Sequence, residues 1–456
     1  MAINEDIENQ ETGDREGAGY SSTTQDAIVE ELSLSTAEYS VFGSILTFGA
    51  MVGAITGGPI ADFVGRKWTM RIASALCVAG WLAIYFAEGA LALDIGRLAT
   101  GCGMGVFSYV VPTFIAEITP KNLRGALTAV NQAKILYEHS RLKLQAWSYW
   151  QKLMIVSGVS VSFIIGTVLA WRVLALIGVI PCAVLLFGLF YIPESPRWLA
   201  KMGHEKEFEA ALQKLRGKDA DISEEAAEIQ DYIETLQLLP KASILDLFQR
   251  RYLSSVIIGV GLMVVQQFGG INGVCFYTSN IFEEAGFCSS VGTITYAILQ
   301  VIVTTIGAAL VDRAGRKPLL LISGTGLVLG CMVTALSFFL KVHDLAADAV
   351  PILAVTGILL NIAAFSARMG TVPWVVMSEI FLINIKGAAG GFATLVNWFG
   401  AWAVSYTFNY LMSWSSYGTF LLYAVINAAG MVFMILVVPE TKGRSLEQIQ
   451  AAINRE

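Results

Sequence analysis

Three charged motifs each occur twice in this sequence, in the same order. The pairs are GPIADFVGRK (58–67) with VDRAGRKP (311–318), VPTFIAEITPKNLRG (111–125) with VPWVVMSEIFLINIKG (372–387), and PESPRW (193–198) with PETKGRS (439–445). Asp62 and Asp312 can accept hydrogen bonds from neighbouring helix N-termini. The cations Arg66, Arg124, Arg316 and Lys386 can pair with the carboxylates of Glu117, Glu194, Glu379 and Asp312. Because such pairs form or separate as two bundles close or open, the motifs predict a two-state gate. The expected gate residues are Asp62, Arg66, Glu117, Arg124, Glu194, Arg197, Asp312, Arg316, Glu379 and Lys386.

Membrane topology is an alternative explanation for the same charges. Basic residues fall in alternate loops, namely at Arg66, Lys67, Arg71, Lys121, Arg124, throughout 193–251, and at Arg313, Arg316, Lys317, Lys386, Lys442 and Arg444. The intervening loops offer only Arg172 and Lys341. Loops rich in Lys and Arg stay in the cytosol, so the basic set is predicted to face inward.

No residue cluster typical of catalysis or metal binding stands out. The chain has three histidines, and its six cysteines lie mostly in apolar stretches without the spacing of metal ligands. We find no pairing of a nucleophile with a base. The sequence therefore predicts neither an enzyme nor a cofactor or metal site, and we expect no nucleic-acid partner.

The composition indicates a protein of the lipid bilayer. Hydrophobic residues make up 55% of the chain and charged residues 14%, whereas soluble proteins carry about a quarter charged residues. A helix that crosses a bilayer needs roughly 20 mostly apolar residues. Eleven such stretches are present, at 41–61, 68–87, 95–116, 153–171, 173–192, 253–278, 290–311, 319–340, 350–378, 388–412 and 420–438. The expected fold is an all-α integral membrane protein with eleven spans.

The repeated motifs divide the chain into two homologous helical halves. The N-terminal half covers 41–192 and the C-terminal half, with six helices, covers 253–438. A cytosolic connection at 193–252 has the pattern of short amphipathic helices. An acidic segment (1–40) and a cytosolic tail (439–456) flank these parts. Two related halves are typical of transporters whose substrate site lies between them near the middle of the membrane.

Two features of the first half break the repeat. Residues 1–40 hold ten acidic residues and one arginine, without an apolar run that matches the span at 253–278. The first span is therefore predicted to be missing. A polar and basic stretch at 133–152 has no counterpart in the second half and is expected to be an insert that lies at the membrane interface.

Several motifs together resemble a known family. GRxxxGxG at 96–103, PESPRW, QQFGGINGVCFY at 266–277 and PETKGRS are similar to those of the sugar porters of the major facilitator superfamily. The segments GYSSTTQDAI, SILDLFQRRY and MSEIFLINIKG resemble those of the plant early-response-to-dehydration branch of monosaccharide transporters. This resemblance covers residues 20 to 450 and implies the major facilitator fold.

The resemblance implies a hexose site made of amides and an indole. The matching residues are Gln132, Gln266, Gln267, Asn272, Trp374 and Asn397, and Gln300 stands where relatives carry an asparagine. Amides both donate to and accept from sugar hydroxyls, and an indole packs on the sugar ring. Polar residues within a membrane suggest a site, although they can also join helices to one another. The expected insert separates Gln132 from the next apolar helix.

Arg97 is the residue that the resemblance links to proton coupling. In proton-coupled relatives an acid on the first span pairs with this arginine, and that span is the one predicted to be missing. Asp94, three residues earlier, can pair with Arg97 on the same helix.

The leading functional prediction is a monosaccharide transporter that works by alternating access. Its expected partners are a sugar of the glucose or fructose class, protons and the lipid bilayer. The alternative is a transport-deficient variant, with a sensing function or none, because the first span is missing. The sequence leaves the plasma membrane and the vacuolar membrane equally open as its location.

Overall fold

A computed structural model describes residues 10–118, 156–217, 220–238, 244–310, 315–381 and 385–440. All regular elements within these ranges are helical. The first half and the connection contain α2 (Gln10–Leu32), α3 (Thr36–Val64), α4 (Arg66–Tyr85), α5 (Ala90–Ile118), a helix at Val156–Gly166, α8 (Trp171–Gly188), α9 (Pro196–Lys201), α10 (Glu205–Arg216), α11 (Ser223–Leu238) and η2 (Ile244–Phe248). Arg124, Gln132, Asp312 and the predicted insert at 133–152 lie outside the described residues.

The second half repeats the helical pattern with two interrupted spans. Its elements are α12 (Arg250–Phe268), α13 (Ile271–Phe276), α14 (Thr278–Glu284), α15 (Ser289–Leu310), α16 (Arg316–Val342), η3 (Ala347–Ala349), α17 (Val350–Ala364), the π-helical turn η4 (Phe365–Met369), α18 (Val372–Ile380), α19 (Lys386–Trp414) and α20 (Ser416–Leu436).

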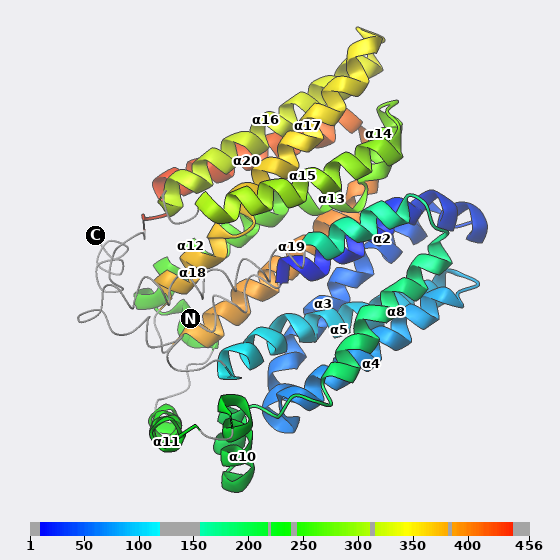
Figure 1. Ribbon diagram of the computed structural model, residues 1–456. Coiled ribbons are helices and arrows are strands. Elements are labelled where there is room, and N and C mark those ends of the chain that lie inside the picture. Colours follow the sequence, from blue (N-terminus) through cyan, green and yellow to red (C-terminus); the bar gives the residue numbers. More distant parts are fainter. Residues whose placement is uncertain are drawn as a thin grey trace.

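The helices form two groups that meet along α2, α3 and α19 (Figure 1). α3, α4, α5 and α8 pack together in the first group, and α16, α17 and α20 pack together in the second. α3 approaches α5 closely at Gly53, where a Cβ atom would collide with the carbonyl oxygen of Cys102. Small residues permit this close packing of helices where lipid offers no hydrophobic driving force.

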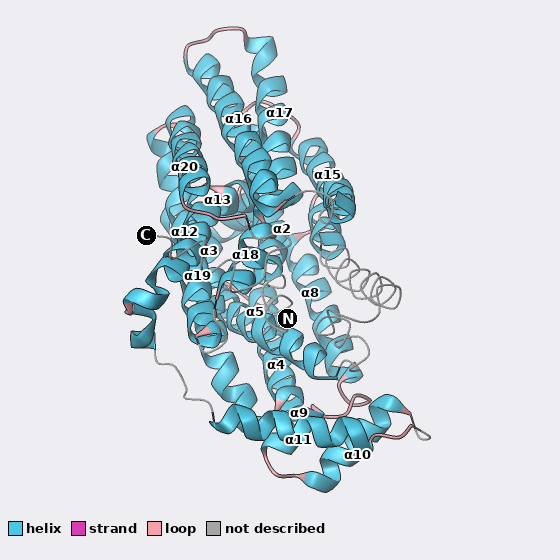
Figure 2. Cartoon of the chain, turned by 90° about the vertical axis from the view of Figure 1, so that its left-hand side faces the viewer, coloured by secondary structure: helices cyan, strands magenta, loops and turns pink. Residues whose placement is uncertain are grey.

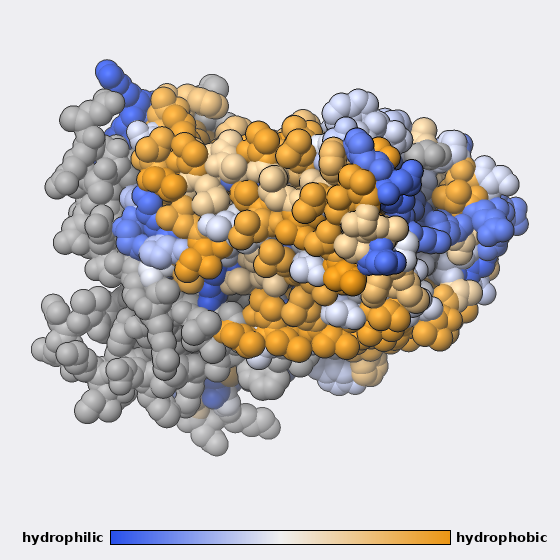
Figure 3. Space-filling view, turned by 90° about the horizontal axis from the view of Figure 1, so that it is seen from above, coloured by the Kyte–Doolittle hydropathy of each residue, from blue (hydrophilic) through white to orange (hydrophobic). Residues whose placement is uncertain are grey.

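In the described ranges, nine helices are long and apolar enough to cross a membrane. The predicted number of eleven is not confirmed. Of the predicted spans, 153–171 is described from residue 156 onward as a short apolar helix, and 388–412 corresponds to α19. α19 packs against α3, α12 and α20, and its polar residues Asn397 and Ser405 are buried. Hydrophobic side chains spread over much of the face seen in Figure 3, as expected of a surface in contact with lipid.

The prediction that residues 1–40 leave the first helical position empty needs correction. α2 lies between the two groups and contacts α3, α5 and α8 on one side and α13 and α14 on the other. Its inward face buries Tyr20, Ser21, Ser22, Thr24 and Ile28. Hydropathy does not detect α2, which is absent from the nine apolar spans. The reason is that α2 faces other helices through small and hydroxyl-bearing side chains.

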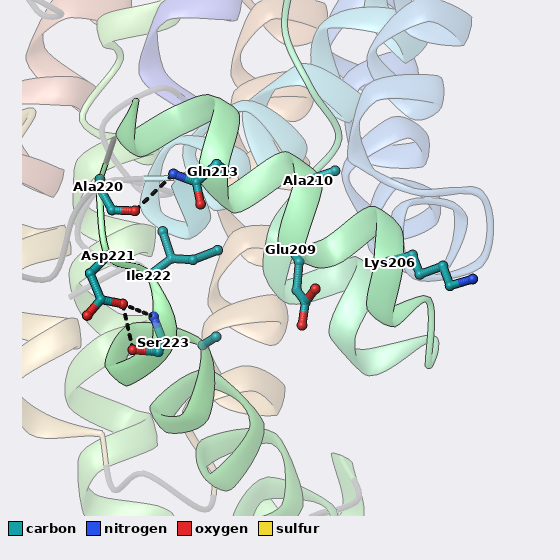
Figure 4. A pocket seen from close by; sticks show the side chains of 9 residues that line it. Lys206, Glu209, Ala210, Gln213, Ala220, Asp221, Ile222 and Ser223 are labelled. Atoms are coloured by element: carbon teal, nitrogen blue, oxygen red, sulfur yellow. Dashed lines mark hydrogen bonds between the residues drawn. The ribbon is translucent and has the colours of Figure 1, made fainter. Parts of the chain in front are cut away.

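The connection between the halves contains α9, α10 and α11, which gather at one end of the molecule (Figure 2). Arg216 forms an ion pair with Glu225 at 2.7 Å and donates to the carbonyl oxygen of Ile118 at 3.0 Å. It thereby ties these helices to the end of α5. An open pocket lies between α10 and α11, beside the Asp221 carboxylate that accepts from Ser223 (Figure 4).

Candidate substrate site and gate

A break between α12 and α13 positions three of the predicted substrate residues. Gly270 has a φ of +90°, a value that side-chain-bearing residues rarely adopt. A Cβ atom there would also contact the ring of Tyr423 at 2.5 Å. Gln266 and Gln267 lie in the last turn of α12, before this break, and Asn272 is the second residue of α13, after it. The turn therefore brings all three amides to one level of the bundle.

Gln267 and Asn272 form a continuous hydrogen-bond chain with Asn397 of α19. Gln267 donates through Nε2 to Oδ1 of Asn397 at 2.6 Å, and Asn272 donates through Nδ2 to Oε1 of Gln267 at 2.7 Å. All three side chains are buried. Residues that the sequence marked separately thus meet in one polar cluster, which joins α12, α13 and α19.

The second interrupted span connects Gln266 to Trp374. The π-helical turn η4 separates α17 from α18 and exposes backbone carbonyl groups. Gln266 donates to the carbonyl oxygens of Met369 at 3.2 Å and Gly370 at 3.0 Å. Trp374 lies one turn beyond, fully buried at 0% exposure, on a helix that packs against α12.

Three of the predicted substrate residues each carry a buried polar atom that has no hydrogen-bond partner within the described residues. These atoms are Oε1 of Gln300, Nε1 of Trp374 and Nδ2 of Asn397. They belong to α15, α18 and α19; α18 and α19 pack on α12, while α15 packs on η4. A buried polar group without a partner is unfavourable by about 1–3 kcal/mol. Two donors and one acceptor are therefore available to a polar guest such as a sugar hydroxyl or water.

Arg97 is fully buried against α2. It donates to Oγ of Ser21 at 2.6 Å, and its guanidinium carbon lies 4.7 Å from the ring centre of Tyr20 and 4.6 Å from that of Phe42. Faces of aromatic rings attract a cation. Oδ1 of Asp94 is buried and has no hydrogen-bond partner within the described residues. The contact residues Ser21 and Tyr20 were missed because residues 1–40 looked too polar to enter the bundle.

Near the C-terminal end of α2, Glu31 ties this helix to the first residues of α8. Its carboxylate accepts from Nε1 of Trp171 at 2.6 Å and forms an ion pair with Arg172 at 3.0 Å. The hydrogen bond from Trp171, followed by those from Arg172, holds the pKa of Glu31 below its ordinary value. The charged end of α2 is thus fixed in place.

The predicted gate residues of the first half meet around Arg66. Its guanidinium forms a two-pronged ion pair with Glu117, with Nε and Nη2 each 2.9 Å from a carboxylate oxygen. Nη1 donates to Asp62 at 3.1 Å. Asp62 in turn accepts from Lys201 at 3.0 Å. The expected pairing of Arg66 with Glu117 is confirmed as a contact, whereas its role in gating stays a prediction.

Glu194, rather than Asp62, binds a helix N-terminus. The expectation that Asp62 accepts from backbone groups is wrong, because Asp62 lies at the C-terminal end of α3 and pairs with side chains. The Glu194 carboxylate accepts from the backbone N–H groups of Arg66 and Lys67 at 3.1 Å. Gly65, with a φ of +92°, forms the turn that directs these N–H groups toward Glu194. A Cβ atom there would lie 2.6 Å from Glu194 Oε2.

The second half repeats this arrangement with Glu440, a residue that the sequence reasoning missed. Its carboxylate accepts from the backbone N–H groups of Arg316 at 3.0 Å and Lys317 at 3.1 Å. Glu440 holds the place in PETKGRS that Glu194 holds in PESPRW. Aligning those two motifs residue by residue would have identified it.

We expect Glu194→Ala and Glu440→Ala to destabilise the protein by similar amounts. Each removes the carboxylate at the start of one long helix, and loss of such a cap is unfavourable by about 1 kcal/mol. Thermal unfolding of the purified protein in detergent measures the effect. The exposed Glu209→Ala on α10 is the control and should leave the melting temperature unchanged. If the melting temperature fell in only one of the two variants, the two carboxylates would not be equivalent caps.

The other predicted gate residues are placed only in part. Arg197 lies in the short helix α9, next to the Ser195 side chain that donates to Glu117. Glu379 lies in α18 and Lys386 begins α19, and their side chains lie outside what is described. Their pairing stays a prediction.

Comparison with known proteins gives a consistent result over the full chain. The sequence profile of the family described as Sugar (and other) transporter matches residues 3–453. Sugar transporter ERD6-like 7 of Arabidopsis thaliana is 69% identical, covering 96% of this chain and 90% of that protein. Sugar transporter ERD6 of the same plant is 43% identical, with 96% and 84% covered. The inward open conformation of the xylose transporter XylE from E. coli has a TM-score of 0.73 at 25% identity, covering 99% of this chain and 98% of that one.

Proposed function

Because the chain belongs to the sugar transporter family of the major facilitator superfamily, we propose that it carries a monosaccharide of the glucose or fructose class by alternating access, together with protons. Family membership confirms the resemblance found in the sequence. It makes the chain a multi-pass membrane transporter for sugar and not an enzyme. The choice between the plasma membrane and the vacuolar membrane stays open.

The observation that carries the sugar proposal is the set of buried, unpartnered polar atoms on three of the predicted substrate residues. Nε1 of Trp374 and Nδ2 of Asn397 are donors, and Oε1 of Gln300 is an acceptor. Sugar hydroxyls both donate and accept, so one sugar can satisfy atoms of both kinds. An indole offers in addition a flat apolar face for the ring. Amides that only joined helices would leave fewer of their polar atoms unused.

The proton proposal rests on Arg97 and Asp94. The hydroxyl of Ser21, which contacts Arg97, does not take up a proton in the physiological range. Asp94 stands one helical turn from Arg97 with a buried oxygen that no described residue binds. Its carboxyl group is therefore the nearest titratable group on this helix for coupling. A solved relative at 23% identity is named a proton:xylose symporter, which is consistent with this proposal.

Uptake of radiolabelled D-glucose into proteoliposomes tests both parts. We expect saturable uptake of D-glucose but not of L-glucose, with acceleration by an inwardly directed proton gradient. Fructose in excess should compete. Saturable uptake without any effect of the gradient would overturn proton coupling alone.

The alternative to the carrier is a transport-deficient variant of the same family. Absence of D-glucose uptake by well-folded protein would support this candidate over the carrier.

A further inference from the structure

A group of cations and aromatic rings lies where α4, α8 and α10 approach one another. We name it the inner patch and define it as Lys67, Trp68, Arg71, Phe190 and Lys214. Lys67, Trp68 and Arg71 stand in the first turns of α4, Phe190 follows α8, and Lys214 lies on α10. Trp68 is 57% exposed and Phe190 is 64% exposed. The patch is therefore open to the surroundings of the protein.

The three cations of this patch are not held in ion pairs with described carboxylates. Lys67 lies close enough to Arg71 and Lys214 to feel the charge of each. No salt bridge joins any of the three to a carboxylate within the described ranges. Glu194 is the acid nearest to Lys67, and its carboxylate is already engaged by backbone N–H groups. Three cations gathered in this way attract an anion.

Arg71 is held between two rings with part of its hydrogen-bonding capacity unused. Its guanidinium carbon lies 4.7 Å from the ring centre of Trp68 and 4.9 Å from that of Phe190. Its Nε is buried and has no hydrogen-bond partner within the described residues. A guanidinium fixed by ring stacking is already oriented for two-pronged binding of a phosphate.

The internal repeat shows that the fold does not require this arrangement. GRKWTMRI at 65–72 aligns with GRKPLLLI at 315–322. Arg66 and Lys67 recur as Arg316 and Lys317, as expected of residues needed for topology or gating. Arg71 corresponds to Leu321 and Trp68 to Pro318. α4 therefore carries a cation and an indole at positions where the equivalent helix, α16, has neither.

The surroundings of the patch are those of a membrane interface. α4 starts after the basic motif predicted to face the cytosol, so its first turns lie at the inner leaflet. The neighbouring Phe63 and Tyr191 are 82% and 66% exposed. Aromatic side chains favour the level of the lipid headgroups, and clustered cations there attract anionic lipids.

We propose that the inner patch binds the phosphate of an anionic phospholipid of the cytosolic leaflet. Arg71 and Lys67 take the phosphate oxygens, and Lys214 reaches it from α10. Trp68 and Phe190 contact the glycerol and the first carbons of the acyl chains. A lipid in this position links α4 to the cytosolic helices, and the proposal is independent of which sugar is carried.

Native mass spectrometry of the delipidated, purified full chain tests the proposal. The probes are dioleoylphosphatidylserine and, as the uncharged comparison, dioleoylphosphatidylcholine. We expect preferential retention of phosphatidylserine. Arg71→Leu, which installs the residue of the second half, and Lys214→Gln should each weaken its binding about five-fold, since a cation near an anionic headgroup contributes roughly that factor.

Lys206→Gln is the matched control, because it removes the same charge from the same helix at a residue outside the patch. It should leave phosphatidylserine binding unchanged. Equal losses in Lys206→Gln and Lys214→Gln would overturn a localised site, and equal retention of the two lipids would overturn anion recognition. Displacement of the lipid by millimolar inorganic phosphate would overturn the requirement for a lipid. Lys214→Gln changes an exposed residue, so its result stands even where Arg71→Leu lowers the yield of folded protein.

Discussion

Gln267→Leu is expected to lower the efficiency of D-glucose uptake roughly 30-fold while the protein still folds. Gln267 links Asn272 and Asn397, with hydrogen bonds of 2.7 and 2.6 Å, so its loss leaves two further buried amides without a partner. Each unsatisfied partner is unfavourable by about 1–3 kcal/mol. A total of about 2 kcal/mol applied to sugar binding lowers uptake efficiency roughly 30-fold. Initial rates in proteoliposomes, over a range of sugar concentrations, measure it.

Asn427→Ala provides the control for a buried amide that serves structure alone. Asn427 donates to the backbone carbonyl oxygens of Gly269 at 3.0 Å and Tyr423 at 2.9 Å. Its removal should lower the melting temperature and leave the KM for D-glucose unchanged. Gln267→Leu should also lower the melting temperature, because it leaves two buried amides without a partner, but it should in addition cause a large loss of uptake. Wild-type uptake by folded Gln267→Leu would show that the amide cluster joins helices and binds no substrate.

Sequence reasoning anticipated the features that depend on a repeated pattern. Arg66 and Glu117 were expected to pair because their motifs recur, and the two side chains do meet. The resemblance to the sugar porters selected the amides Gln267 and Asn397, and a hydrogen bond joins them. A charge or an amide inside a membrane protein needs a partner, which is why such residues meet others.

Features that depend on the path of the backbone were not anticipated. The turn η4 frees the carbonyl groups that hold Gln266, and neither Phe365 nor Met369 marks such a turn in the sequence. α2 was overlooked because hydropathy measures contact with lipid, whereas Ser21 and Tyr20 contact other helices. Asp62 was assigned to a helix N-terminus because motif order does not reveal which of two nearby acids faces the backbone N–H groups.

Arg66→Leu and Glu117→Leu are each expected to destabilise the protein strongly. The double variant should lose much less unfolding free energy than the sum of the two single losses. The pair is largely buried, with side chains 9% and 13% exposed. Removing one partner leaves a buried charge without its counter-charge, which is unfavourable by about 3–5 kcal/mol. Removing both leaves neither charge. Thermal unfolding in detergent, analysed as a double-mutant cycle, measures the coupling free energy.

Lys201→Gln supplies the comparison for an exposed pair at the same site. Lys201 and Asp62 are about half exposed, at 48% and 50% of their side chains. Water and salt screen such a pair, so its loss should change stability by less than about 1 kcal/mol. If the cycle for Arg66 and Glu117 gave a coupling as small as this, the two residues would act as independent topology charges. A large coupling instead shows that the ion pair holds the first turn of α4 to the end of α5.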